Sequence, residues 1–210
     1  MKNTVCYTFR RCPYAIRARM ALDCAGIEPE YREIRFSDKP PQMLTVSPKG
    51  TVPVLVNDGD EVLEESWDIM RWALAQNDPE NWLPDSPDAA KAVDDLVHTN
   101  DHRFKDFLDR YKYADRHPEL SLAQHREQAQ WFLEQLESLL AGGGWLGGDR
   151  MTVGDVAVFP FIRQFSMVEP QWFAHSPFHR IRDWLTRILE SPRFARVMVK
   201  RELWDYRRAA

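Results

Sequence analysis

The stretch "NTVCYTFRRCPYAIRARMALDCAG" (residues 3–26) passes from a β-type run straight into a helix. Residues 3–9 are rich in strand-forming side chains, and residues 13–26 repeat apolar side chains four positions apart before a glycine that stops the helix. The next run, "YREIRF" at residues 31–36, alternates like a second strand. Because a helix lies between the two strands, we expect them to be parallel neighbours in one sheet.

The following segment predicts a hairpin and a second helix. Residues 37–50 hold three prolines and a glycine, which favours a loop with at most one helical turn. The runs "TVPVL" and "EVLEES" flank Asp58-Gly59-Asp60, a hairpin signal, and helical periodicity begins at Ser66. We therefore predict a β-α-β, β-β-α domain at residues 1–78 and a proline-rich linker at residues 79–87.

Residues 88–210 have a different character. Several consecutive segments show helical periodicity, and "GGGWLGGD" reads as a flexible turn between two of them. The patterns, in chain order, cover 89–115, 121–142, 152–168, 178–191 and 192–204. The predicted fold is therefore an α/β N-terminal domain followed by an all-α helical-bundle domain.

Composition limits the function classes. The chain has 210 residues and a net charge of −4, from 28 Lys and Arg against 32 Asp and Glu, which gives no general attraction to nucleic acid. No apolar run approaches the roughly 20 residues needed to span a bilayer, and the N-terminus lacks a signal peptide's apolar stretch, so we expect a cytoplasmic protein without membrane association. The three cysteines, all within the first 24 residues, are expected to be reduced thiols.

Cys12 is the candidate reactive residue. Pro13 suits the first position of a helix, so Cys12 takes the N-cap position, where Ser, Thr, Asp or Asn is usual. The helix dipole and unpaired N–H groups favour the thiolate there, so the pKa of Cys12 should fall. Cys6 and Cys24 are expected to be buried apolar residues. Nearby arginines should also favour the thiolate: Arg10, Arg11, Arg17 and Arg19.

The neighbouring "CPYA" sequence limits the redox chemistry. Position 15 is Ala, so an internal CxxC disulfide cannot form. Redox chemistry at Cys12 would therefore proceed through a mixed disulfide with another molecule, most simply a small cellular thiol.

Two further motifs suit the binding of an extended peptide. Pro53 cannot donate to a strand ladder, so it is either a trans proline opening an edge strand or a cis proline that leaves the backbone of Val52 available. Glu65 and Ser66 precede a helix, where Ser66 can act as the cap. The exposed N–H groups there form an anion site that fits a carboxylate, and a plain helix cap is the alternative.

Taken together, Cys12-Pro13-Tyr14-Ala15, Lys39, "TVPVL" and Glu65-Ser66 resemble the cytosolic glutathione transferases, in particular their cysteine-type, omega-like and bacterial members. The resemblance implies a thioredoxin-like first domain that binds glutathione, a helical second domain that shapes the second-substrate site, and a homodimer. It implies that Cys12 is the catalytic thiol and that glutathione is held by Lys39 at the glycyl carboxylate, Val52 before cis Pro53 at the cysteinyl part, and Glu65 with Ser66 at the γ-glutamyl end.

The second domain offers fewer candidates. Thr152 and Asp155 form a capping-box pattern that we assign to folding. The histidines show no spacing that favours a metal site, and we expect no metal cofactor. Four residues at helical spacing either pack in the core or form a second-substrate wall: Phe104, Phe107, Leu108 and Tyr111.

The leading hypothesis is glutathione-dependent thiol transfer or reduction through a Cys12 mixed disulfide, with a small disulfide or electrophilic substrate. Two alternatives stay open. One is glutathione conjugation or isomerisation of an electrophile without covalent chemistry at Cys12. The other is a non-catalytic glutathione-binding scaffold.

Overall fold

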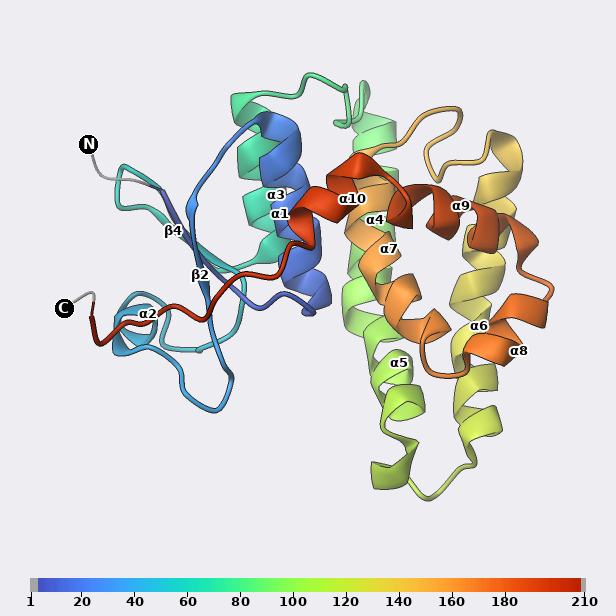
Figure 1. The fold of residues 1–210 in the computed structure, drawn as a ribbon. Helices are drawn as coiled ribbons and strands as arrows, with labels where there is room; N and C mark the ends of the chain where they lie inside the picture. The colour runs from blue at the N-terminus through green and yellow to red at the C-terminus, as the bar shows by residue number, and fades with distance from the viewer. Residues whose placement is uncertain (1–3, 209–210) are drawn as a thin grey trace. The chain divides into compact units, whose positions relative to one another are not determined.

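The structure is a computed structural model that describes residues 4–208. The described residues divide into two compact units (Figure 1), one formed by residues 4–80 with 192–208 and the other by residues 81–191. The predicted second domain ran from residue 88 to residue 210, whereas the structure places residues 192–208 in the first unit. The first predicted domain included residues 1–3 and the second included residues 209–210; these positions lie outside the described residues.

The first unit contains a four-stranded mixed sheet with the strand order β2-β1-β3-β4. β1 and β2 are parallel, as predicted from the intervening helix, whereas β1–β3 and β3–β4 are antiparallel. The predicted hairpin is therefore confirmed. The elements of this unit are β1 (Val5–Thr8), α1 (Pro13–Ala25), β2 (Glu30–Glu33), α2 (Pro41–Val46), β3 (Val54–Val56), β4 (Val62–Leu63), α3 (Ser66–Gln76) and α10 (Pro192–Val197).

The two faces of this sheet are covered differently. Side chains alternate along a strand, so Cys6 and Tyr7 of β1 face opposite sides. Tyr7 shares a buried cluster with Met43 of α2 and Val54 of β3. On the other side, α1 packs against α3, and both helices lie on one side of the strands in Figure 1. α2 fills more of the 37–50 segment than the single turn that its prolines suggested.

The bounds of α1 follow from its sequence. Pro13 opens the helix, and Gly26 ends it in the left-handed conformation with φ 72°. A residue with a Cβ is strained in that conformation, whereas glycine adopts it readily. α1 therefore begins and ends where its two conformationally special residues lie.

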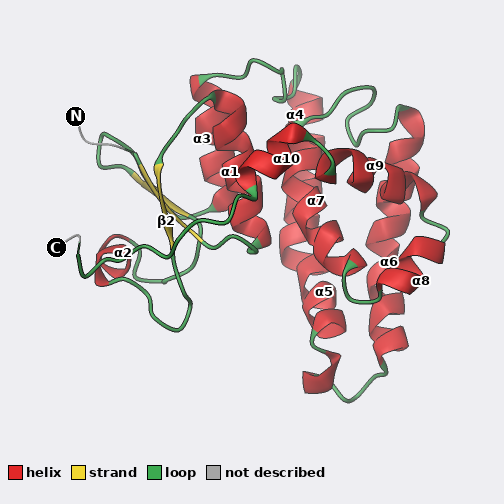
Figure 2. Cartoon of the chain, in the orientation of Figure 1, coloured by secondary structure: helices red, strands yellow, loops and turns green. Residues whose placement is uncertain are grey.

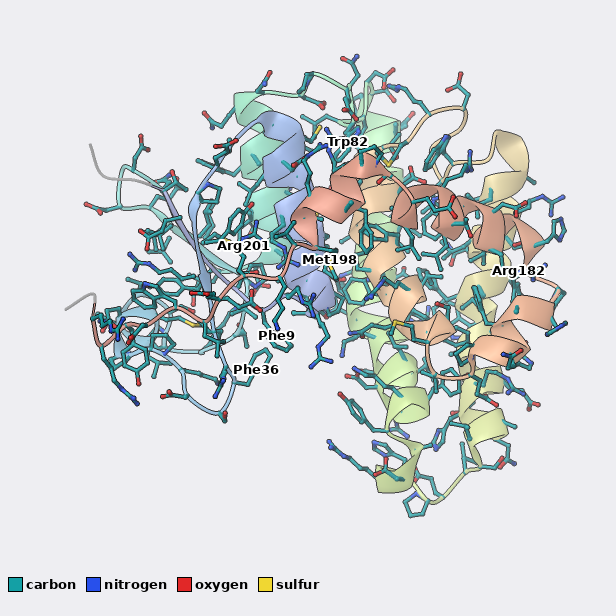
Figure 3. The ribbon with its side chains drawn as sticks, in the orientation of Figure 1. Phe9, Phe36, Trp82, Arg182, Met198 and Arg201 are labelled. Atoms are coloured by element: carbon teal, nitrogen blue, oxygen red, sulfur yellow. The ribbon has the colours of Figure 1, made fainter. Side chains whose placement is uncertain are left out.

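The final segment returns to the first unit instead of continuing as a helix. The pattern at 192–204 predicted one helix, but α10 ends at Val197. We call residues 198–208 the return segment; its residues Met198 and Arg201 are labelled in Figure 3. Its backbone joins the outer edge of β2, where Leu203 bridges to Glu33 and the Trp204 N–H donates to the Glu33 carbonyl at 2.9 Å. Pairing with this strand edge satisfies backbone groups that a longer helix would have satisfied internally.

An ion-pair cluster holds α10 on α1. Asp23 accepts hydrogen bonds from Arg193 and Arg196, each at 2.8 Å, and Arg193 also pairs with Glu80. Burial alone would raise the pKa of Asp23, but the hydrogen bonds from the two arginines outweigh it and hold the pKa below its ordinary value.

We predict that Asp23→Asn lowers the free energy of unfolding of the first unit by about 1–2 kcal/mol at neutral pH, because the charge-assisted hydrogen bonds from Arg193 and Arg196 are weakened. The wild-type contribution is present above the unfolded-state pKa, about 4, and is lost as the pH falls through the lower folded-state pKa. Urea unfolding of both proteins at pH 7 and pH 3 measures this. A wild-type advantage that persists unchanged at pH 3 would contradict the assignment.

The second unit is built of helices joined by loops and turns, as the sequence predicted (Figure 2). α7 contacts α4, α5 and α9, so it lies at the centre of this unit. Nearly all of its residues are buried. The elements are α4 (Pro87–Thr99), a π-helical turn (Asn100–Phe104), α5 (Lys105–Lys112), 3₁₀ turns at Ala114–Arg116 and Leu140–Gly142, α6 (Leu122–Leu139), α7 (Val153–Ser166), α8 (Pro170–His175) and α9 (His179–Leu189).

The predicted capping box begins α7. The Asp155 carboxylate accepts hydrogen bonds from the N–H of Thr152 at 2.8 Å and from its hydroxyl at 2.9 Å. The same carboxylate also accepts from the Leu146 N–H and from the indole N–H of Trp184 on α9, both at 2.8 Å. Asp155 therefore caps α7 and also binds the loop at Leu146 and helix α9 at Trp184.

Within residues 4–208, none of the helices combines the length and the apolar character that crossing a membrane would require.

Candidate functional site

Cys12 caps α1, as predicted. Its carbonyl accepts the first helical hydrogen bond, from the Ile16 N–H at 2.9 Å, and its own N–H donates to the Phe9 carbonyl at 3.1 Å. The side chain is half-buried and packs at the border of the Tyr7–Val54 cluster. The thiol is thus held at the N-terminus of a 13-residue helix, on a residue that keeps partial solvent exposure.

Val52 lies directly beside this thiol. The Val52–Pro53 peptide bond is cis, so the cis alternative is the correct one. The Cys12 Sγ donates to the Val52 carbonyl oxygen at 3.6 Å. Two motifs 40 residues apart in the sequence therefore meet at one point of the first unit.

Lys39 approaches the same region over Gly50. The Lys39 side chain is half-buried, and a Cβ built at Gly50 would lie 3.2 Å from its Nζ. Gly50 has φ +61°, a left-handed conformation that favours glycine, and the close approach of the Lys39 side chain leaves little room for a Cβ. The Lys39 ammonium therefore lies next to Gly50, which precedes Val52 by two residues in the loop that leads to the cis proline.

The start of α3 differs from the prediction in one respect. Ser66 is the first residue of the helix and Glu65 occupies the N-cap position, so the prediction that Ser66 acts as the cap is wrong. The Ser66 side chain is buried, and its hydroxyl accepts a hydrogen bond from the Arg17 Nε at 3.0 Å. The physical reason is competition: a buried guanidinium holds the hydroxyl that would otherwise bond to the helix backbone.

Two residues beside Glu64 and Glu65 were not predicted from the sequence: Ser47 and Lys49. Lys49 forms an ion pair with the exposed Glu65 carboxylate, and the buried Ser47 hydroxyl donates to the Glu64 carboxylate at 2.6 Å. Both partners come from "SPKG", immediately before the cis-proline motif. Their position directly before that motif could have identified them, because the motif and the start of α3 were both candidate ligand-binding elements.

Two of the four arginines near Cys12 are buried and make structural contacts. Arg17 and Arg19 are each 1% exposed. Arg17 donates to Ser66, whereas Arg19 donates to the Arg10 carbonyl at 2.8 Å and the Val197 carbonyl at 3.0 Å. Two of the four arginines therefore fix α1 to its neighbours, and the effect of their charge on the Cys12 thiol stays a prediction.

The other two cysteines are buried, as predicted. Cys6 is fully buried in β1, and burial raises the pKa of its thiol to about 12. Cys24 is 3% exposed, and burial raises the pKa of its thiol to about 11. Since the thiolate is the reactive form, neither is suited to nucleophilic chemistry near neutral pH.

Three of the four candidate residues for a second-substrate wall are buried in the core, and one is partly exposed. Phe104, Leu108 and Tyr111 are at most 1% exposed and belong to the core of the second unit. Phe104 stacks on Phe132 with ring centroids 4.6 Å apart, and the Tyr111 hydroxyl donates to a carboxylate on Glu169. Core packing thus accounts for these three. Phe107 keeps partial exposure beside Trp131, so it alone stays a candidate wall residue.

The part of the chain that the structure describes holds no cluster of three His, Cys, Asp or Glu side chains that could bind a metal ion. The residues gathered at this site are Cys12, Val52, Lys39, Lys49 and the start of α3 at Glu65 and Ser66.

Comparison with known proteins gives consistent results. The profile described as "Glutathione S-transferase, N-terminal domain" matches residues 7–82, and that described as "Glutathione S-transferase, C-terminal domain" matches residues 119–187. Glutathione S-transferase omega-1 of Sus scrofa is 23% identical over 189 residues, which cover 89% of this chain and 76% of the relative.

Solved structures agree in fold. The glutathione transferase Omega 3C of Trametes versicolor has a TM-score of 0.79 at 18% identity, over 97% of this chain and 92% of that one. A glutathione transferase family member of Pseudomonas fluorescens, solved with two glutathione bound, has a TM-score of 0.78 at 20% identity, over 93% of this chain and 92% of that one.

Proposed function

Because the chain belongs to the glutathione S-transferase family, we propose that it is a glutathione-dependent thiol transferase that works through a mixed disulfide at Cys12. The observation that carries the proposal is the position of the Cys12 thiol. It lies at a helix N-terminus, half-buried, 3.6 Å from the carbonyl of Val52. Its expected low pKa, which follows from the helix dipole and the adjacent N–H groups, stays a prediction.

In this proposal glutathione binds as an extended peptide. The cysteinyl N–H of the ligand would donate to the Val52 carbonyl, the same oxygen that accepts the Cys12 thiol, so binding would compete with the hydrogen bond of the protonated thiol. Lys39 would pair with the glycyl carboxylate. Glu65 and Ser66 would hold the γ-glutamyl end, where the Lys49 ammonium already pairs with Glu65.

The proposed reaction has two exchanges. The Cys12 thiolate attacks the glutathionyl sulfur of a mixed disulfide; the Cys12–glutathione S–S bond forms, and the substrate leaves as a thiolate that takes up a proton. A second glutathione, as thiolate, then attacks the bound glutathionyl sulfur. This releases oxidised glutathione and regenerates the Cys12 thiolate.

A covalent adduct tests the proposal. After incubation with oxidised glutathione and removal of the excess, we expect the protein to gain the mass of one glutathionyl group, mapped by peptide analysis to Cys12. Reduced glutathione should remove it. Absence of an adduct, together with conjugation of an aryl halide that survives Cys12→Ala, would favour the conjugating alternative. Tight glutathione binding without turnover on a broad panel would favour the scaffold alternative.

Two further features belong to this proposal. Reduced thiols suit the cytoplasm, which we propose as the place of action. The family relationship also supports a homodimer, which light scattering of the purified protein measures.

A further inference from the structure

Lys39 lies in the loop between β2 and α2. A backbone hydrogen bond from Asp38 N–H to the Arg35 carbonyl at 3.2 Å closes a turn just before Lys39. Asp38 itself is exposed. Loop residues without packing are ordered only at an entropic cost, which a binding ligand would have to offset.

The return segment is anchored beside this loop. The Trp204 N–H pairs with the Glu33 carbonyl on β2, and the Trp204 ring lies 4.1 Å from the Arg32 guanidinium and 5.7 Å from the Tyr7 ring, edge to face. Trp204 also packs on the buried cluster that contains Val52. This anchor fixes the position of the two residues that follow it.

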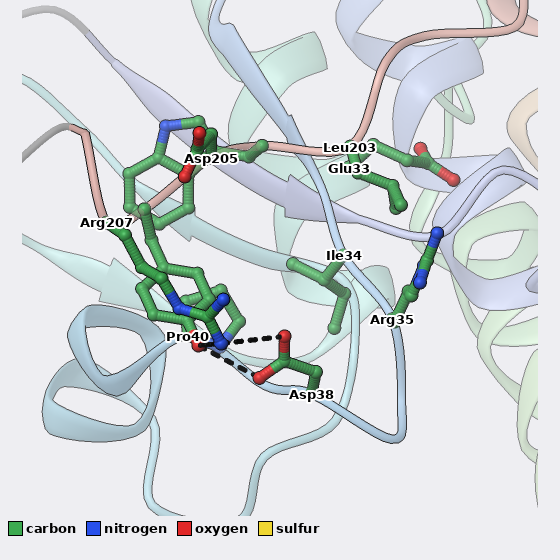
Figure 4. A pocket seen from close by; sticks show the side chains of 10 residues that line it. Glu33, Ile34, Arg35, Asp38, Pro40, Leu203, Asp205 and Arg207 are labelled. Atoms are coloured by element: carbon green, nitrogen blue, oxygen red, sulfur yellow. Dashed lines mark hydrogen bonds and ion pairs between the residues drawn. The ribbon is translucent and has the colours of Figure 1, made fainter.

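Tyr206 then contacts one residue on each side of Lys39 in the sequence: Asp38 in the loop and Gln42 in α2. Its hydroxyl donates to Asp38 Oδ1 at 2.9 Å, and its carbonyl accepts from Gln42 Nε2 at 3.4 Å. Figure 4 shows Asp38 facing the return segment across a small pocket, with dashed lines marking its contacts. Arg207 pairs with Asp38 at 3.7 Å, but both side chains are more than half exposed, so this ion pair contributes little.

We propose that Tyr206 is a positioning residue that holds Lys39 in place for the terminal carboxylate of the peptide ligand. The inference rests on the proposed function, because it assumes that glutathione binds with its glycyl carboxylate at Lys39. It assigns to the return segment a role in ligand affinity, acting through the residues that flank Lys39.

Two ligands separate this role from general stability. S-Methylglutathione carries the glycyl carboxylate, whereas S-methyl-γ-glutamylcysteine lacks the glycine; neither can form a disulfide with Cys12. By calorimetric titration of the full chain, Tyr206→Phe is expected to raise the Kd of the first about fivefold, the effect of one lost hydrogen bond. The Kd of the second should stay unchanged.

Matched variants sharpen the test. Tyr113→Phe removes a hydroxyl from a half-buried tyrosine of the second unit and should leave both Kd values unchanged. Lys39→Ala should abolish the preference for the glycine-containing ligand. In the double variant Lys39→Ala with Tyr206→Phe, the tyrosine change should have no further effect, because it acts through Lys39.

Three results would overturn the inference. Tyr206→Phe could leave both Kd values unchanged, or it could weaken both ligands equally, as a general loss of structure would. If the wild-type protein bound S-methylglutathione normally in either case, the proposed function would survive without this inference. A wild-type protein that bound neither ligand would overturn both.

Discussion

Replacing Cys12 by Ser is expected to lower kcat/KM for glutathione-dependent disulfide reduction by on the order of 10³-fold or more, because a hydroxyl is not ionised near neutral pH and cannot exchange with a disulfide. The substitution keeps the N-cap position and improves its capping chemistry, so the fold should be retained. Reduction of a small mixed disulfide of glutathione, followed by formation of oxidised glutathione, gives the rate.

The matched control is Cys24→Ala. Cys24 lies on the same helix but is buried and its thiol pKa is raised, so its removal should leave the rate within about twofold of wild type. A Cys12→Ser protein that melts at the wild-type temperature and still exchanges disulfides at the wild-type rate would refute the covalent route. If the Cys24 variant lost activity and the Cys12 variant did not, Cys24 would be the reactive thiol instead of Cys12.

Much of this site could be predicted because its signals are local. Cys12 and Pro13 mark a helix start within two residues, and Gly26 marks the helix end through its own backbone conformation. Pro53 restricts its own peptide bond, so the sequence could narrow it to two alternatives, and the structure selects cis. Such features depend on a few adjacent residues, which is why one sequence suffices to find them.

The return segment could not be predicted, since its conformation depends on residues far away in the chain. Residues 192–204 have helical periodicity, yet the helix stops at Val197 because Leu203 and Trp204 pair with Glu33 on a strand edge. The pairing of Lys49 with Glu65 is similar in kind. Each side chain looks solvent-exposed by sequence, and only the folded loop brings them together.

Buried polar partners were equally inaccessible from the sequence. Thr152 and Asp155 showed a capping box, which the structure confirms, but nothing local indicated that Trp184 donates to the same carboxylate. Arg17 likewise looked like one of several cations near a thiol, and it proves to be buried on Ser66. In both cases the nearby sequence identified one residue of the hydrogen bond, and its partner far away in the chain could be found only in the folded structure.

Asp155→Ala is expected to destabilise the second unit by about 3–5 kcal/mol. The carboxylate is fully buried and accepts four hydrogen bonds, two from Thr152, one from Leu146 and one from Trp184. Loss of the cap costs about 1 kcal/mol, the buried Trp184 indole N–H left without an acceptor costs about 1–3 kcal/mol, and the lost bond from the half-buried Leu146 N–H costs about 1 kcal/mol. Urea unfolding followed by tryptophan fluorescence measures the change.

The size of this effect depends on the orphaned indole, and a double-mutant cycle isolates it. Trp184→Phe removes the donor, so in its background Asp155→Ala should cost about 1–2 kcal/mol less than it does alone. Asp149→Ala, at an exposed aspartate six residues before Asp155, should change the free energy of unfolding by less than about 0.5 kcal/mol. If Asp155→Ala cost only about 1 kcal/mol, the carboxylate would be a plain helix cap, and the central position of α7 would have to be explained by apolar packing alone.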